Sequence, residues 1–315
     1  MAPTETDIAI VQLVFFTPVV PLSIWLWCRY GFRLGAGAWR LVLVLGLLRL
    51  IAGSCALAAE YHPSESLYAA VLSCDLVGTA PLLLLSMRLV ERVNDTYHKL
   101  PARLFRLVDL ASLVGLVVGI IGANQALTSL GSGKPFTVNG PMIGAMVLFI
   151  VVLAADLIST AILFIPAVKG EPPVVNSAEK HELGAHGKLD SARSASSASP
   201  ALNRTRGDIE SNNDDDTTFR RAGQQIEVAA ARKLIIAVSL MAPFLVVRLL
   251  FAAIGDFRND LNFIPYLGDH SIYLGMSVLM EIVAAYICLG VGFACPPPPP
   301  PPAKTKASWW SKLRG

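Results

Sequence analysis

Five charged residues lie inside long apolar stretches of the sequence: Arg49, Asp75, Asp156, Arg248 and Glu281. An arginine at the centre of a membrane span costs about 2.5–3.5 kcal/mol on insertion scales, so it requires a carboxylate partner or water. A guanidinium can donate two parallel hydrogen bonds to one carboxylate. The sequence therefore predicts a buried polar centre in which Arg49 contacts Asp75 or Glu281. We expect Arg248 to contact a carboxylate or a water-filled outer cavity.

Other intramembrane chemistries do not fit these residues. A retinal protein needs a lysine in its seventh span for the Schiff base, and residues 271–294 contain none. A zinc hydrolase of this architecture needs intramembrane histidines, but all five histidines lie in predicted loops. Asp75 and Asp156 could form an aspartyl-protease pair, yet neither has the flanking glycine of such enzymes. We therefore expect no catalytic residue, no cofactor and no metal site, and we do not expect an enzyme.

The composition indicates which elements must position these charges. The chain has 315 residues, 54% of them hydrophobic and 16% charged, and its mean hydropathy is +0.55. These values are typical of a polytopic membrane protein rather than a soluble domain. An all-α fold is predicted, because only α-helices and closed β-barrels can cross a lipid bilayer and the sequence has no period-two strand pattern. Seven runs are long enough to span a bilayer: Ile8–Cys28, Trp39–Ala59, Ser66–Ser86, Leu104–Leu127, Pro141–Val168, Leu234–Ile254 and Ser271–Ala294.

The distribution of Lys and Arg predicts the orientation of the seven helices. The N-terminus and the second, fourth and sixth connections contain only Lys134 and Arg258, whereas the other connections and the tail contain 20 such residues. The positive-inside rule then places the N-terminus outside and the C-terminus in the cytosol. We expect the plasma membrane rather than an internal membrane.

Two polar segments set the expected domain organisation. Residues 169–231 are poor in aromatic residues and rich in Ser, Ala, Asp and Asn, so a disordered cytosolic loop is predicted. This loop separates the extracellular N-terminus and helices one to five, residues 1–168, from helices six and seven, residues 232–295. The cytosolic tail, residues 296–315, begins with seven prolines and ends in AKTKASWWSKLRG.

The tail indicates what kinds of partner to expect. A polyproline helix docks in the aromatic grooves of signalling modules. Two tryptophans beside basic residues equally suit an anionic lipid surface. The expected partners are therefore the lipid bilayer, a cytosolic polyproline-binding or signalling protein, and an unidentified ligand of the polar centre; nucleic acid is not expected.

Four sequence motifs together resemble a known group of membrane proteins. They are Leu47-Leu48-Arg49, Glu91-Arg92-Val93-Asn94-Asp95, Pro243-Phe244-Leu245-x-x-Arg248-Leu249 and Tyr273-Leu274-x-Met276-x-Val278-Leu279-Met280-Glu281. The group is a family of fungal seven-span integral membrane proteins filed under a domain of unknown function. The resemblance covers Asp7–Phe293 apart from the long fifth connection. It implies a seven-span fungal membrane protein without an established activity, near but apart from the lipid-translocating-exporter-like and rhodopsin-like fungal families.

Two classes of function fit these features. The first is a receptor-like bundle whose polar centre, among the second, third, sixth and seventh spans, binds a ligand or couples to a cytosolic partner. The alternative is a transporter or lipid-handling protein built from two three-helix units, because Arg49-Leu50-Ile51 and Arg248-Leu249-Leu250 recur in spans that run in the same direction. A third interpretation, in which the charges only pair and hold the helices together, stays open here.

Overall fold

The computed structural model describes residues 4–30, 37–62, 64–131, 138–169, 206–258, 263 and 268–296. Its helices are α1 (Glu5–Tyr30), α2 (Gly37–Tyr61), α3 (Glu65–Tyr97), α4 (Ala102–Gly131), α5 (Gly140–Lys169), α7 (Arg206–Arg258), α8 (His270–Tyr273), the π-helical turn η3 (Leu274–Val278) and α9 (Leu279–Ala294). Within the described ranges, seven helices are long and apolar enough to cross a membrane, with α8, η3 and α9 forming one of them. The predicted all-α, seven-span fold is confirmed.

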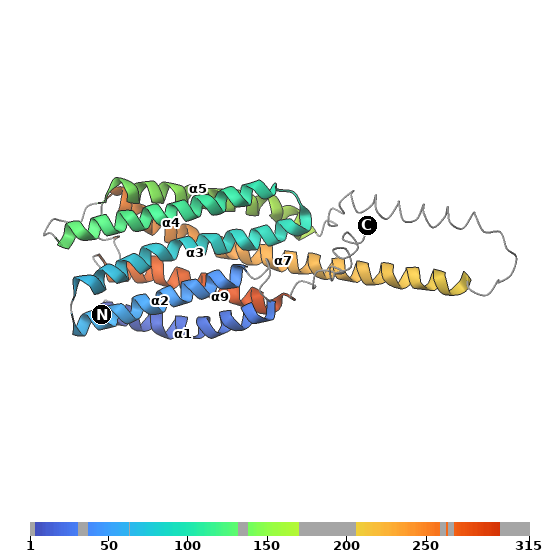
Figure 1. Cartoon of the computed structure of the whole chain (residues 1–315), viewed down its shortest axis with the longest axis horizontal. Helices are drawn as coiled ribbons and strands as arrows, with labels where there is room; N and C mark the ends of the chain where they lie inside the picture. Colours follow the sequence, from blue (N-terminus) through green and yellow to red (C-terminus); the bar gives the residue numbers. More distant parts are fainter. Residues whose placement is uncertain are drawn as a thin grey trace, which may run out of the picture.

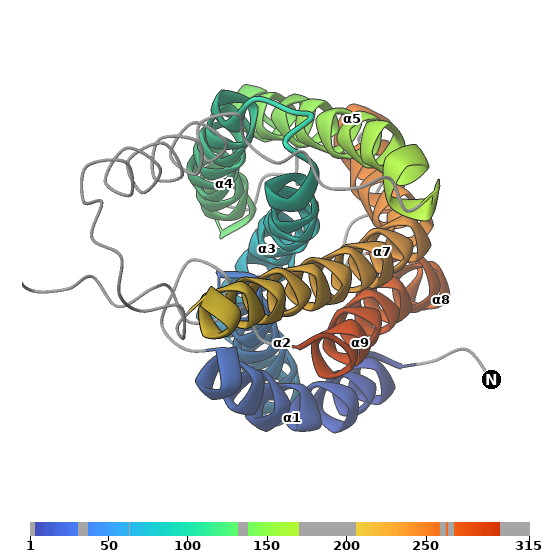
Figure 2. The same ribbon diagram turned by 90° about the vertical axis from the view of Figure 1, so that its right-hand side faces the viewer.

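The seven long helices run lengthwise beside one another (Figure 1) and, viewed end-on, follow one another in chain order around the bundle, with α3 near its centre (Figure 2). Each helix packs against the next along the chain, and α1 also contacts α9, which closes the ring. Helix α3 additionally contacts α5 and α7 and therefore lies at the centre of the bundle. Side chains from α3 consequently meet those of most other helices.

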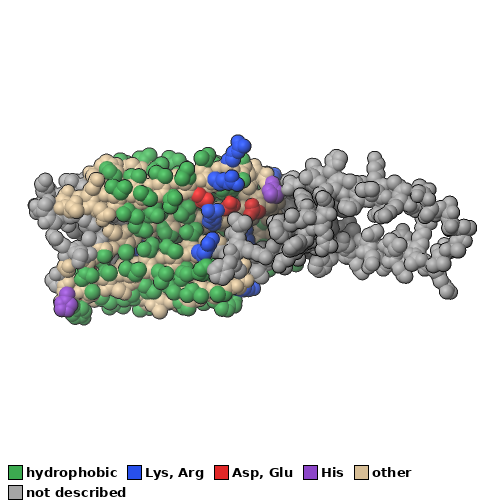
Figure 3. Space-filling model, in the orientation of Figure 1, with side chains coloured by type: hydrophobic (Ala, Val, Ile, Leu, Met, Phe, Trp, Pro, Cys, Tyr) green, Lys and Arg blue, Asp and Glu red, His purple; other side chains and the backbone are tan. Residues whose placement is uncertain are grey.

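The two ends of the bundle differ in charge. We call the end that contains Glu5, Tyr61, Glu65 and His270 the N-terminal end, and the end that contains Tyr30, Tyr97, Lys169 and Ala294 the basic end. Figure 3 shows Lys and Arg side chains gathered near the basic end, beside a largely apolar face. Helix α7 extends beyond the other helices at that end (Figure 1).

Two helices, α3 and α7, extend by ten or more residues beyond their predicted spans. The third span is predicted to end at Ser86, but α3 continues to Tyr97, because Val90, Val93 and Tyr97 recur every three to four residues and bury one face. Helix α7 begins at Arg206, so the last part of the segment predicted to be disordered is helical. Its stretch Gln224–Lys233 is rich in helix-forming Ala, Gln, Glu and Arg, which allows the span to continue outward. The rest of that segment, and the polyproline run after Pro296, lie outside the described residues.

Helices α1, α2 and α9 approach closely near the basic end. A Cβ atom at Gly292 would lie 2.5 Å from Trp39 and 2.9 Å from Leu26, so only glycine fits there without a shift of α9. The Tyr30 hydroxyl donates to the carbonyl oxygens of Gly292 (2.9 Å) and Cys295 (2.8 Å). This contact fixes the C-terminal end of α9 against α1.

Candidate functional site

Four of the five predicted charged residues meet in the middle of the bundle. Arg49 lies on α2, Asp75 on α3, Arg248 on α7 and Glu281 on α9. Each lies about 10–12 residues, or roughly 15–18 Å, from the point where its span reaches the N-terminal end of the bundle: Tyr61, Glu65, Arg258 and His270, respectively. Three of the side chains are fully buried, and Arg248 is 3% exposed. We call these residues the charged quartet.

Each arginine of the quartet contacts both carboxylates. Arg49 pairs with Asp75 through Nη1 and with both oxygens of Glu281 through Nη2 and Nε. Arg248 Nε donates to Glu281 Oε1 at 2.7 Å, and its Nη2 lies 3.4 Å from Asp75 Oδ2 and 3.2 Å from the Asp75 carbonyl oxygen. Two positive and two negative charges therefore compensate one another, as buried charges must.

Space for the Arg49 guanidinium comes from a glycine on the neighbouring helix. Gly78 lies on α3, three residues after Asp75, and a Cβ atom there would be 3.1 Å from Arg49 Nη2. The absence of a side chain at this position lets the guanidinium lie flat against α3. Because Arg49 is held by two carboxylates, it has little freedom to move away from a larger residue.

A hydrogen-bonded chain connects the quartet to α1. Tyr273 donates its hydroxyl to Asp75 Oδ1 at 2.8 Å, and Gln12 Nε2 donates to the Tyr273 oxygen at 3.3 Å. Gln12 Oε1 is buried and has no hydrogen-bond partner in the described structure. Five helices, α1, α2, α3, α7 and the seventh span, thus contribute to one buried polar network.

The π-helical turn aligns two of these residues. Tyr273 and Glu281 are eight residues apart, and in a regular α-helix they would differ by about 80° around the axis. The turn at Leu274–Val278 adds one residue to that stretch, which brings both side chains to within about 20° of one face. Such insertions are frequent at functional sites.

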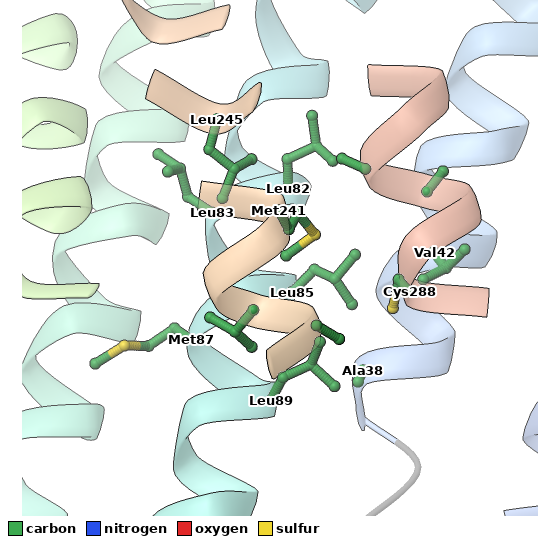
Figure 4. Close-up of a cluster of buried hydrophobic side chains, with 14 of the residues drawn as sticks. Ala38, Val42, Leu82, Leu83, Leu85, Met87, Leu89, Met241, Leu245 and Cys288 are labelled. Carbon is green, nitrogen blue, oxygen red and sulfur yellow. The ribbon is translucent and has the colours of Figure 1, made fainter. Parts of the chain in front are cut away.

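An apolar layer separates the quartet from the basic end. Val42, Leu82, Met241 and Cys288 each lie seven residues, about two turns or 10 Å, beyond a quartet residue on the same helix. All four are at most 1% exposed. Figure 4 shows them inside the bundle, together with Leu85 and Leu89 of α3. Polar groups therefore do not form a continuous path from the quartet to the basic end through this layer.

The fifth predicted residue, Asp156, does not join the quartet. It lies on α5 and accepts a hydrogen bond from Ser86 at 2.6 Å. Ser86 is eleven residues beyond Asp75 on α3, a separation of about 16 Å along the helix. The sequence groups Asp156 with the other four charges, but the structure separates it from them, because α3 continues to Tyr97 and Ser86 lies nearer the basic end than Asp75.

Sequence reasoning missed Gln12 and Tyr273. Gln12 is the only amide side chain within the predicted first span, and this was an available signal. Tyr273 gave no such signal, because its contact with Asp75 depends on the π-helical turn, which no local pattern predicts.

Further polar contacts close the basic end. Lys233 Nζ donates to the Ala294 carbonyl oxygen at 3.2 Å, and Arg92 Nη2 donates to that of Pro296 at 3.3 Å. Together with Tyr30, these side chains from α7, α3 and α1 satisfy carbonyl groups that a helix C-terminus leaves without partners. Arg92 also lies over the Tyr30 ring, 5.2 Å from its centroid.

Comparisons with known proteins give one match. A family model described as "Domain of unknown function (DUF7702)" matches residues 3–174 and 218–296. No curated protein matches the chain. No solved structure matches it either.

Proposed function

This chain belongs to the DUF7702 family, whose description assigns no activity, and we propose from its structure that it acts as a receptor-like membrane protein. In this proposal a ligand changes the contacts within the charged quartet. The ends of the helices around α9, at the basic end, then change their packing in response. The observation that carries the proposal is the quartet itself, which joins α2, α3, α7 and α9 through two arginines that each contact two carboxylates.

The energetic cost of such a network supports a functional role. Removing ions from water costs several kcal/mol per ion in proteins, and replacing a buried ion pair by apolar residues is often neutral or stabilising. Ionisable residues within membrane spans accordingly mark functional sites by default. A bundle that needed only stability would be served as well by leucine at these four positions.

The arrangement of the helices supports a receptor over an open pathway. Tyr273 and Gln12 extend the polar network from the quartet to buried positions nearer the N-terminal end, whereas the apolar layer lies between the quartet and the basic end. A ligand with a carboxylate or an ammonium group could compete for the quartet's charges. Because the quartet holds α7 and α9 to α2 and α3, such competition would loosen contacts that continue to the basic end.

The contacts of the two quartet carboxylates favour ligand binding over catalysis. Asp75 and Glu281 both serve as partners of Arg49 and Arg248, and Asp75 additionally accepts from Tyr273. Neither carboxylate is thus placed to act as a general base or nucleophile. We propose binding rather than catalysis.

One observation favours the alternative of a transporter or lipid-handling protein made of two three-helix units. The first unit is α1–α3, and the second is α5, α7 and the seventh span. Arg49 pairs with Asp75 of its own unit and with Glu281 of the other, and Arg248 pairs with Glu281 of its own unit and with Asp75 of the other, so the contacts are reciprocal. Reciprocal contacts of this kind are expected of two parallel repeats related by an axis along the membrane normal, as in some transporters.

Reconstitution distinguishes the two proposals. We expect proteoliposomes containing the full chain and NBD-labelled phosphatidylcholine to lose about half of their fluorescence when dithionite is added outside, as protein-free vesicles do. The reason is that the apolar layer and the intact ring offer a headgroup no polar route. Fluorescence loss well beyond half, dependent on the amount of protein, would support lipid handling and contradict the receptor-like proposal.

We propose the orientation from the charge of the loops, with the basic end in the cytosol and the N-terminal end outside, in the plasma membrane. In this orientation, α7 would extend into the cytosol, where a signalling or polyproline-binding partner could reach it and the tail. In intact cells, external protease is expected to cleave an epitope tag fused before Met1 and to spare one fused after Gly315. Cleavage of the C-terminal tag alone would reverse the orientation.

A further inference from the structure

Asp156 is a fully buried carboxylate whose environment the quartet does not explain. It lies on α5 between α3 and α4, and its Oδ2 accepts from Ser86. Its Oδ1 has no hydrogen-bond partner in the described structure. A buried charged oxygen without a partner is costly, so a group that is not part of the chain is expected beside it.

Two buried hydroxyl groups nearby are also without partners. Ser159 and Thr160 follow Asp156 by three and four residues and therefore lie on the same face of α5. The hydroxyl oxygens of Ser159 and Thr160 make no hydrogen bond in the described structure, although each residue is at most 6% exposed.

The balance of buried charge identifies what the site lacks. Among the described residues, the buried charged side chains are Arg49, Arg248, Asp75, Glu281 and Asp156. The quartet is neutral by itself, which leaves Asp156 with one uncompensated negative charge. One monovalent cation would restore neutrality in this part of the bundle.

We propose that Asp156, Ser159 and Thr160 bind one sodium ion between α3 and α5, with Ser86 holding Asp156 through Oδ2. Hard cations prefer carboxylate and hydroxyl oxygens and bind them at about 2.3–2.6 Å, as calcium does. Oxygens arranged around such an ion stand farther apart than hydrogen-bonded oxygens, which agrees with the lack of hydrogen bonds at Asp156 Oδ1 and at the hydroxyls of Ser159 and Thr160. A proton on Asp156 would balance the charge but would leave the two hydroxyls without partners. A divalent ion would leave an excess positive charge.

Thermal unfolding in nanodiscs tests the sodium site directly. The full-length protein is heated in NaCl, KCl or N-methyl-D-glucamine chloride at constant ionic strength and pH. We expect the Tm to rise with sodium and to saturate, by on the order of 2–4 °C at about a tenfold excess over the midpoint concentration, and to rise less with potassium. Ser159→Ala should raise the sodium midpoint about tenfold, the loss expected when one ligand is removed.

Two carboxylate-to-amide variants complete the experiment. Asp156→Asn should abolish the sodium-dependent rise and should melt no lower than the wild type in sodium-free buffer, because it removes the uncompensated charge. Asp109→Asn is the matched control, since Asp109 lies near the basic end, paired with Arg88 at 2.6 Å, and should keep the full rise. A wild-type Tm equal in all three salts, a rise retained in Asp156→Asn, or stabilisation by acid alone would overturn the proposal. The receptor-like proposal does not depend on this outcome, because the two sites share no residue.

Discussion

Replacing Arg49 by methionine is expected to destabilise the bundle by about 3–5 kcal/mol, the loss measured when one partner of a buried ion pair is removed. Methionine approximates the length of the side chain, so the loss reflects charge more than volume. In Arg49→Met, the two carboxylates Asp75 and Glu281 face a single guanidinium, that of Arg248. One negative charge would then remain unpaired in a medium of low dielectric constant.

A second substitution should restore most of this stability. In Arg49→Met with Glu281→Gln, Arg248 and Asp75 form a neutral pair 3.4 Å apart. The charges balance again, and the glutamine retains the shape and an acceptor oxygen of the glutamate. We expect the double variant to recover more than half of the free energy lost in the single variant.

The measurement is reversible unfolding by sodium dodecyl sulfate in mixed micelles, followed by tryptophan fluorescence. The matched control is Arg88→Met with Glu91→Gln, which removes an ion pair of 2.6 Å whose side chains are about one third exposed, together with the 2.6 Å contact of Arg88 with Asp109, near the basic end. That control should change the free energy of unfolding by only about 0–1 kcal/mol. A double variant of the quartet that is no more stable than Arg49→Met would contradict pairing between these residues.

Much of the fold was predictable because lipid imposes strong constraints on the sequence. Each of the seven predicted spans lies within one helical span of the structure, since about 20 apolar residues are required and no other structure satisfies the backbone. The meeting of Arg49, Asp75, Arg248 and Glu281 was predictable for the same reason. Few charged side chains of opposite sign lie at the same depth in the membrane, so the partners of a mid-span charge are limited. The depth of each residue follows from the helical rise per residue.

The remaining features depend on packing that a sequence does not display. Asp156 was counted with the quartet because the sequence does not show that α3 continues to Tyr97, which places Ser86 and Asp156 nearer the basic end than Asp75. The extent of α3 depends on tertiary burial of Val90, Val93 and Tyr97, which follow the apolar run. The π-helical turn that brings Tyr273 onto the Glu281 face packs against α7 and α1, and no local pattern in the sequence predicts it.

The double variant should also change the populations of two conformations. A receptor-like bundle populates an active minor conformation at about 0.1–10% without its ligand. A hydrogen bond to a charged group contributes about 1.5–3 kcal/mol, and each 1.4 kcal/mol is tenfold in an equilibrium constant. For a minor conformation that begins near the upper end of this range, at about 5–10%, loss of the four-helix contact in Arg49→Met with Glu281→Gln should raise it to about one third or more.

The distance between α3 and α7 at the basic end reports this change. Asp95 on α3 and Arg232 on α7 are both exposed and accept spin labels after substitution by cysteine. Cys28, Cys55 and Cys74 are not buried and are replaced by alanine in this background, whereas Cys288 and Cys295 are buried and remain. Before labelling, the protein with these cysteine and alanine substitutions must have the same free energy of unfolding as the wild type.

Double electron–electron resonance on this labelled pair in nanodiscs tests whether the quartet controls the conformation of the bundle. The account predicts one dominant distance in the otherwise wild-type protein and a second, longer distance in about a third or more of the molecules carrying Arg49→Met and Glu281→Gln. A single, unchanged distance distribution in that folded variant would contradict it and would leave the quartet as a structural lock between helices.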